Sequence, residues 1–221
     1  MELYEVMRTT FAAREFLDEP VTDADIRNIL DNARFAPSGG NRQGWRVLVI
    51  REPDTREAML PMIMPTFQRY VAQVQAGEAP WNTINETRLT AEEIASTEPP
   101  EAFIQQVLAA PVLLLVLVDL SVVASFDAQL DRVGVISGAS IYPFVWNILL
   151  AARNEGLGGT LTTFIAGREG EVRDLLGIPD HLAVAALLPI GRPVKQLTRL
   201  SRKPVDEFAM RERWDGAPLS D

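Results

Sequence analysis

The chain has 221 residues, of which 47% are hydrophobic and 23% are charged, and it carries a net charge of -9 at neutral pH. This balance is typical of a globular protein with one sizeable core, and we expect a single domain over residues 1–221. The negative charge opposes binding to nucleic acid and to anionic membranes. The absence of cysteine excludes disulfides, thiolate metal sites and a cysteine nucleophile.

The first ten residues, MELYEVMRTT, carry charged side chains throughout. They lack the apolar core of a signal peptide. We therefore expect a cytoplasmic protein.

Residues 21–37, VTDADIRNILDNARFAP, have the apolar spacing of an amphipathic helix. Thr22 is the expected N-cap, with Asp25 three residues later, and Pro37 is the expected end. The loop that follows, APSGGNRQGW at 36–45, gathers residues that turns use for purely backbone reasons. Alone, it indicates only that the chain reverses.

Three apolar runs have the length and the β-branched content of strands. They cover residues 46–51, 112–119 and 183–191, and the second is apolar enough to be buried on both faces. Residues 61–105 mix isolated apolar residues with proline, glycine and acidic clusters, without sustained periodicity. We expect this segment to be a lid or an irregular excursion.

Residues 133–156 show a long helical pattern that is apolar on nearly every face, with Gly156 placed as a C-terminal cap. The length of this run also fits a membrane span. However, Ser137, Pro143 and Arg153 interrupt its apolar character, and no second span accompanies it. We expect a central, buried helix and no membrane contact.

Residues 192–203, RPVKQLTRLSRK, hold five basic residues and no acidic one, in a chain that is otherwise acidic. Two interpretations are open. The stretch is either a solvated tail that offsets the acidic body or an anion-binding site.

Few side chains could carry out chemistry unaided. His181 is the only histidine and lies in a turn-like stretch, where we expect it to be exposed; a zinc site would then need mainly carboxylates. No nucleophile elbow and no P-loop is present. The glycines of GLGGTLTTF, residues 156–164, follow a helix and lack the third glycine of a dinucleotide fingerprint. This pattern suits a protein that supplies binding and electrostatics to a cofactor.

Four stretches, in this order, resemble the FMN-dependent nitroreductase family: RTTFAAREFLDEPV, APSGGNRQGWRVLVI, EGLGGTLTTF, and LLPIGRP followed by the basic tail. The resemblance implies an α+β fold, in which a mixed sheet is flanked by helices and the long helix is central and buried. It also implies an obligate homodimer with one FMN at each end of the subunit interface. Residues 61–105 are then a variable excursion or lid, and residues 192–221 a C-terminal basic arm.

The resemblance implies an FMN phosphate site built from arginines. Arg14 is expected to face the ribityl phosphate, and Arg202, with Arg199 as a weaker candidate, to reach the same anion. A guanidinium suits phosphate because its planar fork donates two parallel hydrogen bonds. Phe11 and Glu15 depart from the family, which often has basic or polar residues there.

The loop at 36–45 acquires a role through the resemblance. Pro37, Ser38 and Gly39 match the loop that covers the flavin from the partner subunit, and glycine lets the backbone approach the ring. Asn41 is expected to brace this loop.

Thr162 and Thr163 match the segment that passes the N5 edge of the isoalloxazine, where a backbone N–H can donate.

The function implied by the resemblance is an oxidoreductase with a ping-pong mechanism. NADH or NADPH reduces bound FMN by hydride transfer and leaves, and a nitroaromatic, quinone or other small electron acceptor takes its place. No side chain needs to act as acid or base, so we assign neither a catalytic residue nor a metal. The alternative is a flavin-sequestering protein with little turnover, in which residues 61–105 close the ring face. A third option uses the flavin for dehalogenation or for cutting up the flavin itself.

Overall fold

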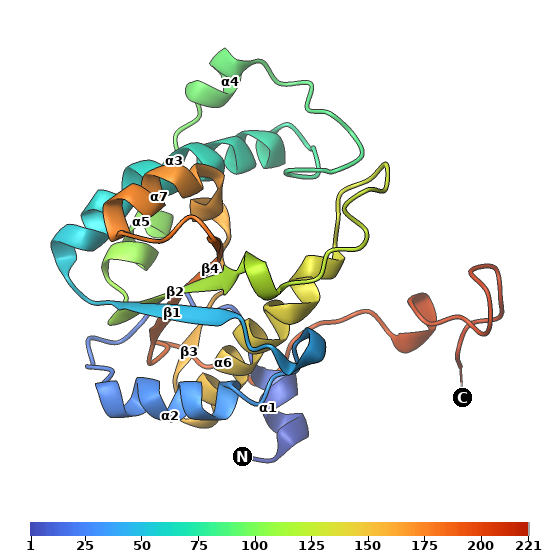
Figure 1. The fold of residues 1–221 in the computed structure, drawn as a ribbon, viewed down its shortest axis with the longest axis horizontal. Coiled ribbons are helices and arrows are strands. Elements are labelled where there is room, and N and C mark those ends of the chain that lie inside the picture. Colours follow the sequence, from blue (N-terminus) through green and yellow to red (C-terminus); the bar gives the residue numbers. More distant parts are fainter. Residues whose placement is uncertain (221) are drawn as a thin grey trace.

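The structure is a computed structural model that describes residues 1–220, apart from the side chain of Gln106. Its helices are α1 (Leu3–Thr9), α2 (Asp23–Ala33), α3 (Pro53–Gln75), α4 (Ala91–Ala95), α5 (Glu101–Leu108), α6 (Tyr142–Asn154) and α7 (Glu169–Leu176). Its strands are β1 (Trp45–Ile50), β2 (Val112–Asp119), β3 (Gly158–Gly159) and β4 (Leu182–Gly191). Figure 1 shows a central sheet with α3, α5 and α7 over one face and α2 and α6 over the other.

The strands follow the order β1-β2-β4-β3, and each neighbouring pair is antiparallel. Among the described residues, the one parallel pairing is an isolated bridge between Ala12 and Gly159. The α+β fold class is thus confirmed, with the three longer strands starting or ending within one residue of the predicted ranges.

Strand β2 is buried on both faces, as its unbroken apolar run predicts. Side chains alternate across a strand, so Leu114 and Val116 pack with α2 and α6, whereas Leu113 and Leu115 pack with α3, α5 and α7. The two cores therefore lie on opposite faces of the sheet.

Helix α2 begins where the sequence predicts. Thr22 accepts a hydrogen bond from the backbone N–H of Asp25, and the Asp25 carboxylate accepts one from the backbone N–H of Thr22. This capping box satisfies two groups that a helix terminus leaves unpaired. The helix ends at Ala33, which is earlier than the predicted end at Pro37.

The predicted helix over 133–156 is too long at its start. Helix α6 begins at Tyr142, after a 3-10 segment at Ile136–Ser140. A helix that began at 133 would hold Pro143 in its interior, where proline removes a hydrogen bond and clashes with the preceding turn; in the first turn it is tolerated. Gly156, with a φ of +75°, has the left-handed conformation expected after a helix end.

The prediction that residues 61–105 are irregular is wrong for the first third of this segment. Helix α3 runs to Gln75 with Pro61 and Pro65 inside it. Met59, Ile63 and Phe67 recur at the helical spacing and are buried, so packing offsets the two prolines. The remaining irregular part is the loop of residues 76–90, followed by α4 and α5.

The segment around residues 10–17 is tied to distant parts of the chain. Phe16 forms an isolated bridge with Pro193, and the backbone N–H of Val194 donates to Glu15 O at 3.1 Å. The side chain of Gln196 donates to Thr9 O at 3.0 Å, and after this contact the C-terminal arm leaves the body of the molecule with little regular structure (Figure 1). Residue 221 of the predicted arm lies outside the described residues.

Candidate functional site

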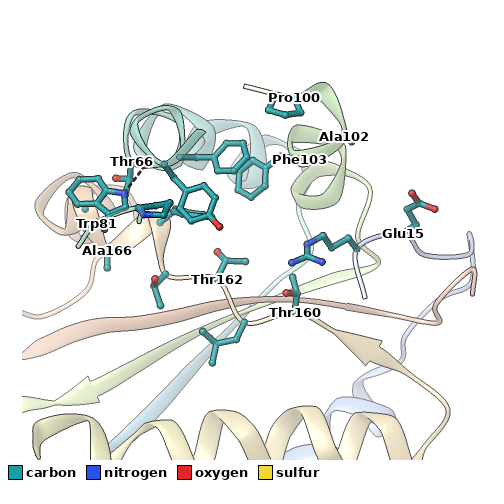
Figure 2. Close-up of a pocket in the computed structure, with 17 residues that line it drawn as sticks. Glu15, Thr66, Trp81, Pro100, Ala102, Phe103, Thr160, Thr162 and Ala166 are labelled. Carbon is teal, nitrogen blue, oxygen red and sulfur yellow. Dashed lines mark hydrogen bonds between the residues drawn. The ribbon is translucent and has the colours of Figure 1, made fainter. Parts of the chain in front are cut away.

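A pocket of about 860 Å³ lies between the sheet edge and the helices α3 and α5. Its floor is the segment 160–167, which follows β3, and its walls come from α3, the loop of residues 76–90 and α5. Figure 2 shows Thr160 and Thr162 on one side of the space and Trp81 and Phe103 on the other. The volume falls in the range of small-molecule and cofactor sites.

The floor is fixed by the neighbouring strand. The backbone N–H of Thr162 donates to Leu187 O at 3.0 Å, and the N–H of Leu187 donates back to Thr162 O at 2.8 Å. Thr162 therefore cannot offer its own N–H to a ligand. The N–H of Thr163 donates to no group within residues 1–220, and Thr163 also lines the pocket. Of the two predicted residues, Thr163 carries the available backbone donor.

Aromatic side chains from α3 and α5, together with Phe164 at the floor, form an aromatic wall of the pocket. Phe67 of α3 stacks on Phe103 of α5 with ring centroids 3.6 Å apart, and Phe164 meets both rings at steep angles. Tyr70, one turn further along α3, contacts Phe164 edge to face. This wall offers an apolar surface on which a planar ring can pack.

Charge is confined to one end of the pocket. Arg14 and Glu15 are the charged residues that line it. Both side chains are exposed. The guanidinium of Arg14 makes a single hydrogen bond, to Ala12 O at 3.3 Å, so most of its donors remain open to an anion. Phe11 is not among the lining residues.

The loop of residues 76–90 is anchored by one carboxylate. Glu78 accepts hydrogen bonds from the hydroxyl of Thr87 at 2.6 Å and from the backbone N–H of Arg88 at 2.8 Å. The hydrogen bond from Thr87, followed by that from Arg88, lowers the pKa of Glu78 from 4.5 to about 2. The start and the end of the loop are thus joined through a group that stays ionised.

The predicted loop at Pro37, Ser38 and Gly39 does not line this pocket within one chain. Ser38 Oγ accepts a hydrogen bond from the N–H of Gln43, and the Asn41 side chain accepts one from the Gln43 amide. The backbone N–H of Gly39 also donates to Ser140 Oγ at 3.1 Å, so the loop is held both within itself and by the segment before α6.

The arm arginines also lie apart from the pocket. Neither Arg199 nor Arg202 pairs with a carboxylate among residues 1–220, whereas Arg192 and Lys203 pair with Glu19 and Glu207. The structure thus brings together Arg14, Thr162 and Thr163, and leaves the other predicted residues outside.

The aromatic wall was missed by the sequence analysis. Phe67 and Tyr70 lie three residues apart, a spacing that places both on one side of a helix. Pro61 and Pro65 obscured that signal, because prolines within a short window argue against a helix.

Two absences can be stated of the described residues. None of their helices has both the length and the apolarity to cross a bilayer. Within the same part of the chain, no three histidine, cysteine or acidic residues gather closely enough to hold a metal ion. His181 is exposed, as expected.

A family model described as the nitroreductase family matches residues 7–192. The chain belongs to the nitroreductase family. It is 27% identical over 218 residues to human iodotyrosine deiodinase 1, covering 94% of this chain and 67% of the relative. It is 27% identical over 209 residues to an NADH dehydrogenase of Thermus thermophilus, covering 89% of each.

Among solved structures, the fold resembles oxidised iodotyrosine deiodinase bound to FMN and 3-iodo-L-tyrosine. The TM-score is 0.66 at 24% identity, with 92% of this chain and 96% of the other covered. At that identity the likeness establishes the shared fold.

Proposed function

We propose that the protein is an FMN-dependent oxidoreductase that takes electrons from NADH or NADPH and passes them to a small acceptor. The observation that carries this proposal is the pocket that unites Arg14 with the segment around Thr162 and Thr163 in a chain of the nitroreductase family. Nitroaromatics, quinones and related planar molecules are the acceptor class.

The residues of the pocket fit FMN in three respects. Arg14 offers a guanidinium with open donors for the phosphate. The aromatic wall around Phe67 and Phe103 offers apolar surface for the ring. The N–H of Thr163 is a backbone donor beside the floor, suited to an electron-rich ring edge.

When bound, FMN would supply the redox chemistry: two electrons arrive as a hydride from the nicotinamide and leave to a second molecule. The chain binds, orients and shields. Arg14 would hold the phosphate end, the floor would fix the ring edge, and the aromatic wall would exclude water. We assign no side chain as acid or base.

One subunit leaves this site incomplete, which supports a homodimer as part of the proposal. A second copy would bring the loop of Pro37, Ser38 and Gly39 over the ring, with Asn41 bracing it. Arg202, or Arg199, would add a second guanidinium at the phosphate. The length of the arm and its departure from the body are consistent with such reach (Figure 1).

A flavin-sequestering protein with little turnover is the second candidate. It is favoured by the fixed loop of residues 76–90, whose Pro80 and Trp81 line the pocket. Dehalogenation is a third, since human iodotyrosine deiodinase 1 is a relative.

The test is anaerobic reduction of the FMN-loaded protein. We expect about one FMN per chain, identified by the mass of the released flavin, and bleaching of its absorbance on addition of NADH or NADPH. Menadione, nitrobenzene and 3-iodotyrosine are then added to separate samples of the reduced protein. The preferred acceptor is the one that restores the flavin absorbance. A protein that stays yellow is a sequestering protein, and recovery of FAD or of no flavin contradicts the cofactor assignment.

A further inference from the structure

Trp81 has an unusual backbone for a bulky residue. Its φ is +51°, in the left-handed region that is unfavourable for side chains with a Cβ. The loop contains Gly77, which would accept such a conformation freely. A strained residue that persists needs support from its surroundings, and such residues cluster at ligand sites.

Three contacts hold Trp81 in this conformation. Its backbone N–H donates to Gln73 Oε1 at 3.0 Å, and its indole N–H donates to Thr66 O at 3.2 Å (Figure 2). The guanidinium of Arg69 lies 4.2 Å from the centroid of the indole ring. Backbone, ring edge and ring plane are therefore each fixed.

A second set of hydrogen bonds fixes Gln73, which is one of the partners of Trp81. Gln73 is only 2% exposed, and its amide Nε2 donates to Glu78 Oε2 at 3.2 Å. Glu78 also receives the hydrogen bonds from Thr87 and Arg88 that join the two ends of the loop. The amide of Gln73 is thus a buried bridge between Trp81 and the carboxylate that fixes the loop. Leaving either partner unpaired would be costly.

Despite this fixation, Trp81 is 43% exposed and lines the pocket. The pocket residues around it, Phe67 and Tyr70 among them, carry no charge. The guanidinium of Arg69 lies over the indole ring, and part of the indole surface is exposed. An apolar ring held this rigidly loses little entropy when a flat ligand packs on the exposed part. The chemistry that matches is a planar aromatic ring without charge.

We propose that Trp81 determines acceptor specificity by packing against the planar ring of the electron acceptor, with Gln73 and Glu78 as its positioning residues. That the ring ligand is an electron acceptor rests on the proposed function. The loop of residues 76–90 then acts as a fixed wall rather than as a swinging lid, since a swing that carried Trp81 away would break its hydrogen bonds to Gln73 and Thr66.

The first test compares two acceptors of the FMN-loaded enzyme, menadione, which is a planar aromatic, and ferricyanide, which is not. Trp81→Ala should lower the ratio of their kcat/KM values about three- to tenfold, and Trp81→Phe should retain most of it. Trp214→Ala, at an exposed tryptophan of the arm, is the matched control. An equal fall for both acceptors, or an unchanged ratio, overturns the proposal.

The second test addresses the positioning residues without flavin. In the parent the Arg88 backbone is bonded to Glu78, so tryptic cleavage after Arg88 should be slow. Gln73→Leu and Glu78→Gln should accelerate it at least about tenfold, measured by the masses of the fragments. Gln75→Leu and Glu92→Gln, at exposed neighbouring positions, should not.

The two positioning variants should also lower the acceptor ratio toward that of Trp81→Ala. Faster cleavage with an unchanged ratio would make the network purely structural and overturn the proposal. Should the parent show no turnover, quenching of tryptophan fluorescence by menadione decides instead. Quenching that is stronger in the parent than in Trp81→Phe supports contact between menadione and the Trp81 ring. Equal quenching in both proteins overturns the proposal.

Discussion

Arg14 is the one cationic residue among those that line the pocket, and we propose that it binds the FMN phosphate. Arg14→Gln should weaken FMN binding by about 1.5–3 kcal/mol, the range for a hydrogen bond to a charged group. Riboflavin lacks the phosphate, so its affinity should hardly change. Flavin fluorescence titrations of both ligands measure the difference, and equal losses would indicate a folding defect instead of a lost phosphate contact.

Arg202 decides between the two interpretations of the basic arm. If it reaches the phosphate from a neighbouring subunit, Arg202→Ala should cost FMN about 1.5–3 kcal/mol and leave riboflavin unaffected. If the arm is solvated, the change should stay within about 0.5 kcal/mol, as for an ordinary surface substitution. Arg211→Ala, further along the arm, is the matched control.

Glu78 should make the loop of residues 76–90 resistant to acid. Its pKa is lower in the folded protein, about 2 against 4.5, so its stabilising contribution is complete above pH 4.5 and is lost as the pH falls toward 2. Glu78→Gln removes that dependence. The gap in unfolding temperature between the parent and Glu78→Gln should therefore be widest above pH 4.5 and narrow below it. A gap that widens on acidification contradicts this assignment.

The residues that sequence reasoning could place are those whose role is local. Thr22 and Asp25 act within one helical turn, and their capping box is present as predicted. Trp81 could not be found that way, because its position depends on Thr66 and Gln73, residues of a different element. Thr162 lies in the segment that was expected to offer a backbone donor, yet its N–H is used by Leu187 of a strand that the sequence pattern could not pair with it.

At the scale of elements, a proline within α3 lowers the stability of the protein, and a substitution can restore it. Pro65 lies on its exposed side and leaves the carbonyl of Pro61 without its helical partner. Pro65→Ala should stabilise the protein by about 2 kcal/mol, which raises Tm by roughly 4–8 °C for a chain of this size. Pro53→Ala is the control, because proline at the first position of a helix is favourable. Thermal unfolding should show a gain for the first variant only.

The boundaries of helices show why element prediction fails where it does. Apolar periodicity continued from residue 133 through 156, yet the helix could start only at Tyr142, where Pro143 falls in the first turn. In α3, proline misled the prediction in the other direction. Pro61 and Pro65 argued against a helix, yet the burial of Met59, Ile63 and Phe67 outweighs their cost. The effect of proline depends on tertiary packing, which no local pattern contains.

At the scale of the whole molecule, the exposed apolar surface predicts a homodimer. Trp146 of α6 is 42% exposed and, with Tyr142, borders a groove of about 820 Å³ lined by Val123, Val135 and Ala183. Sedimentation at micromolar concentration should show one species near twice 24.5 kDa. Trp146→Glu should shift it toward monomer and weaken FMN binding. A folded monomer that holds FMN tightly would contradict both the dimer and the shared site.

The ties between residues 12–16 and the start of the arm bear on the order in which the protein folds. Gly159, Pro193 and Val194 are made well after residues 12–16, so the segment that carries Arg14 lacks these backbone partners until synthesis has passed about residue 194. Closing so long a loop is slow compared with forming α2 or α3. We therefore expect the end of the pocket that holds Arg14 to assemble late, once residues 12–16 have met Gly159 and Pro193, and cofactor uptake to follow that step.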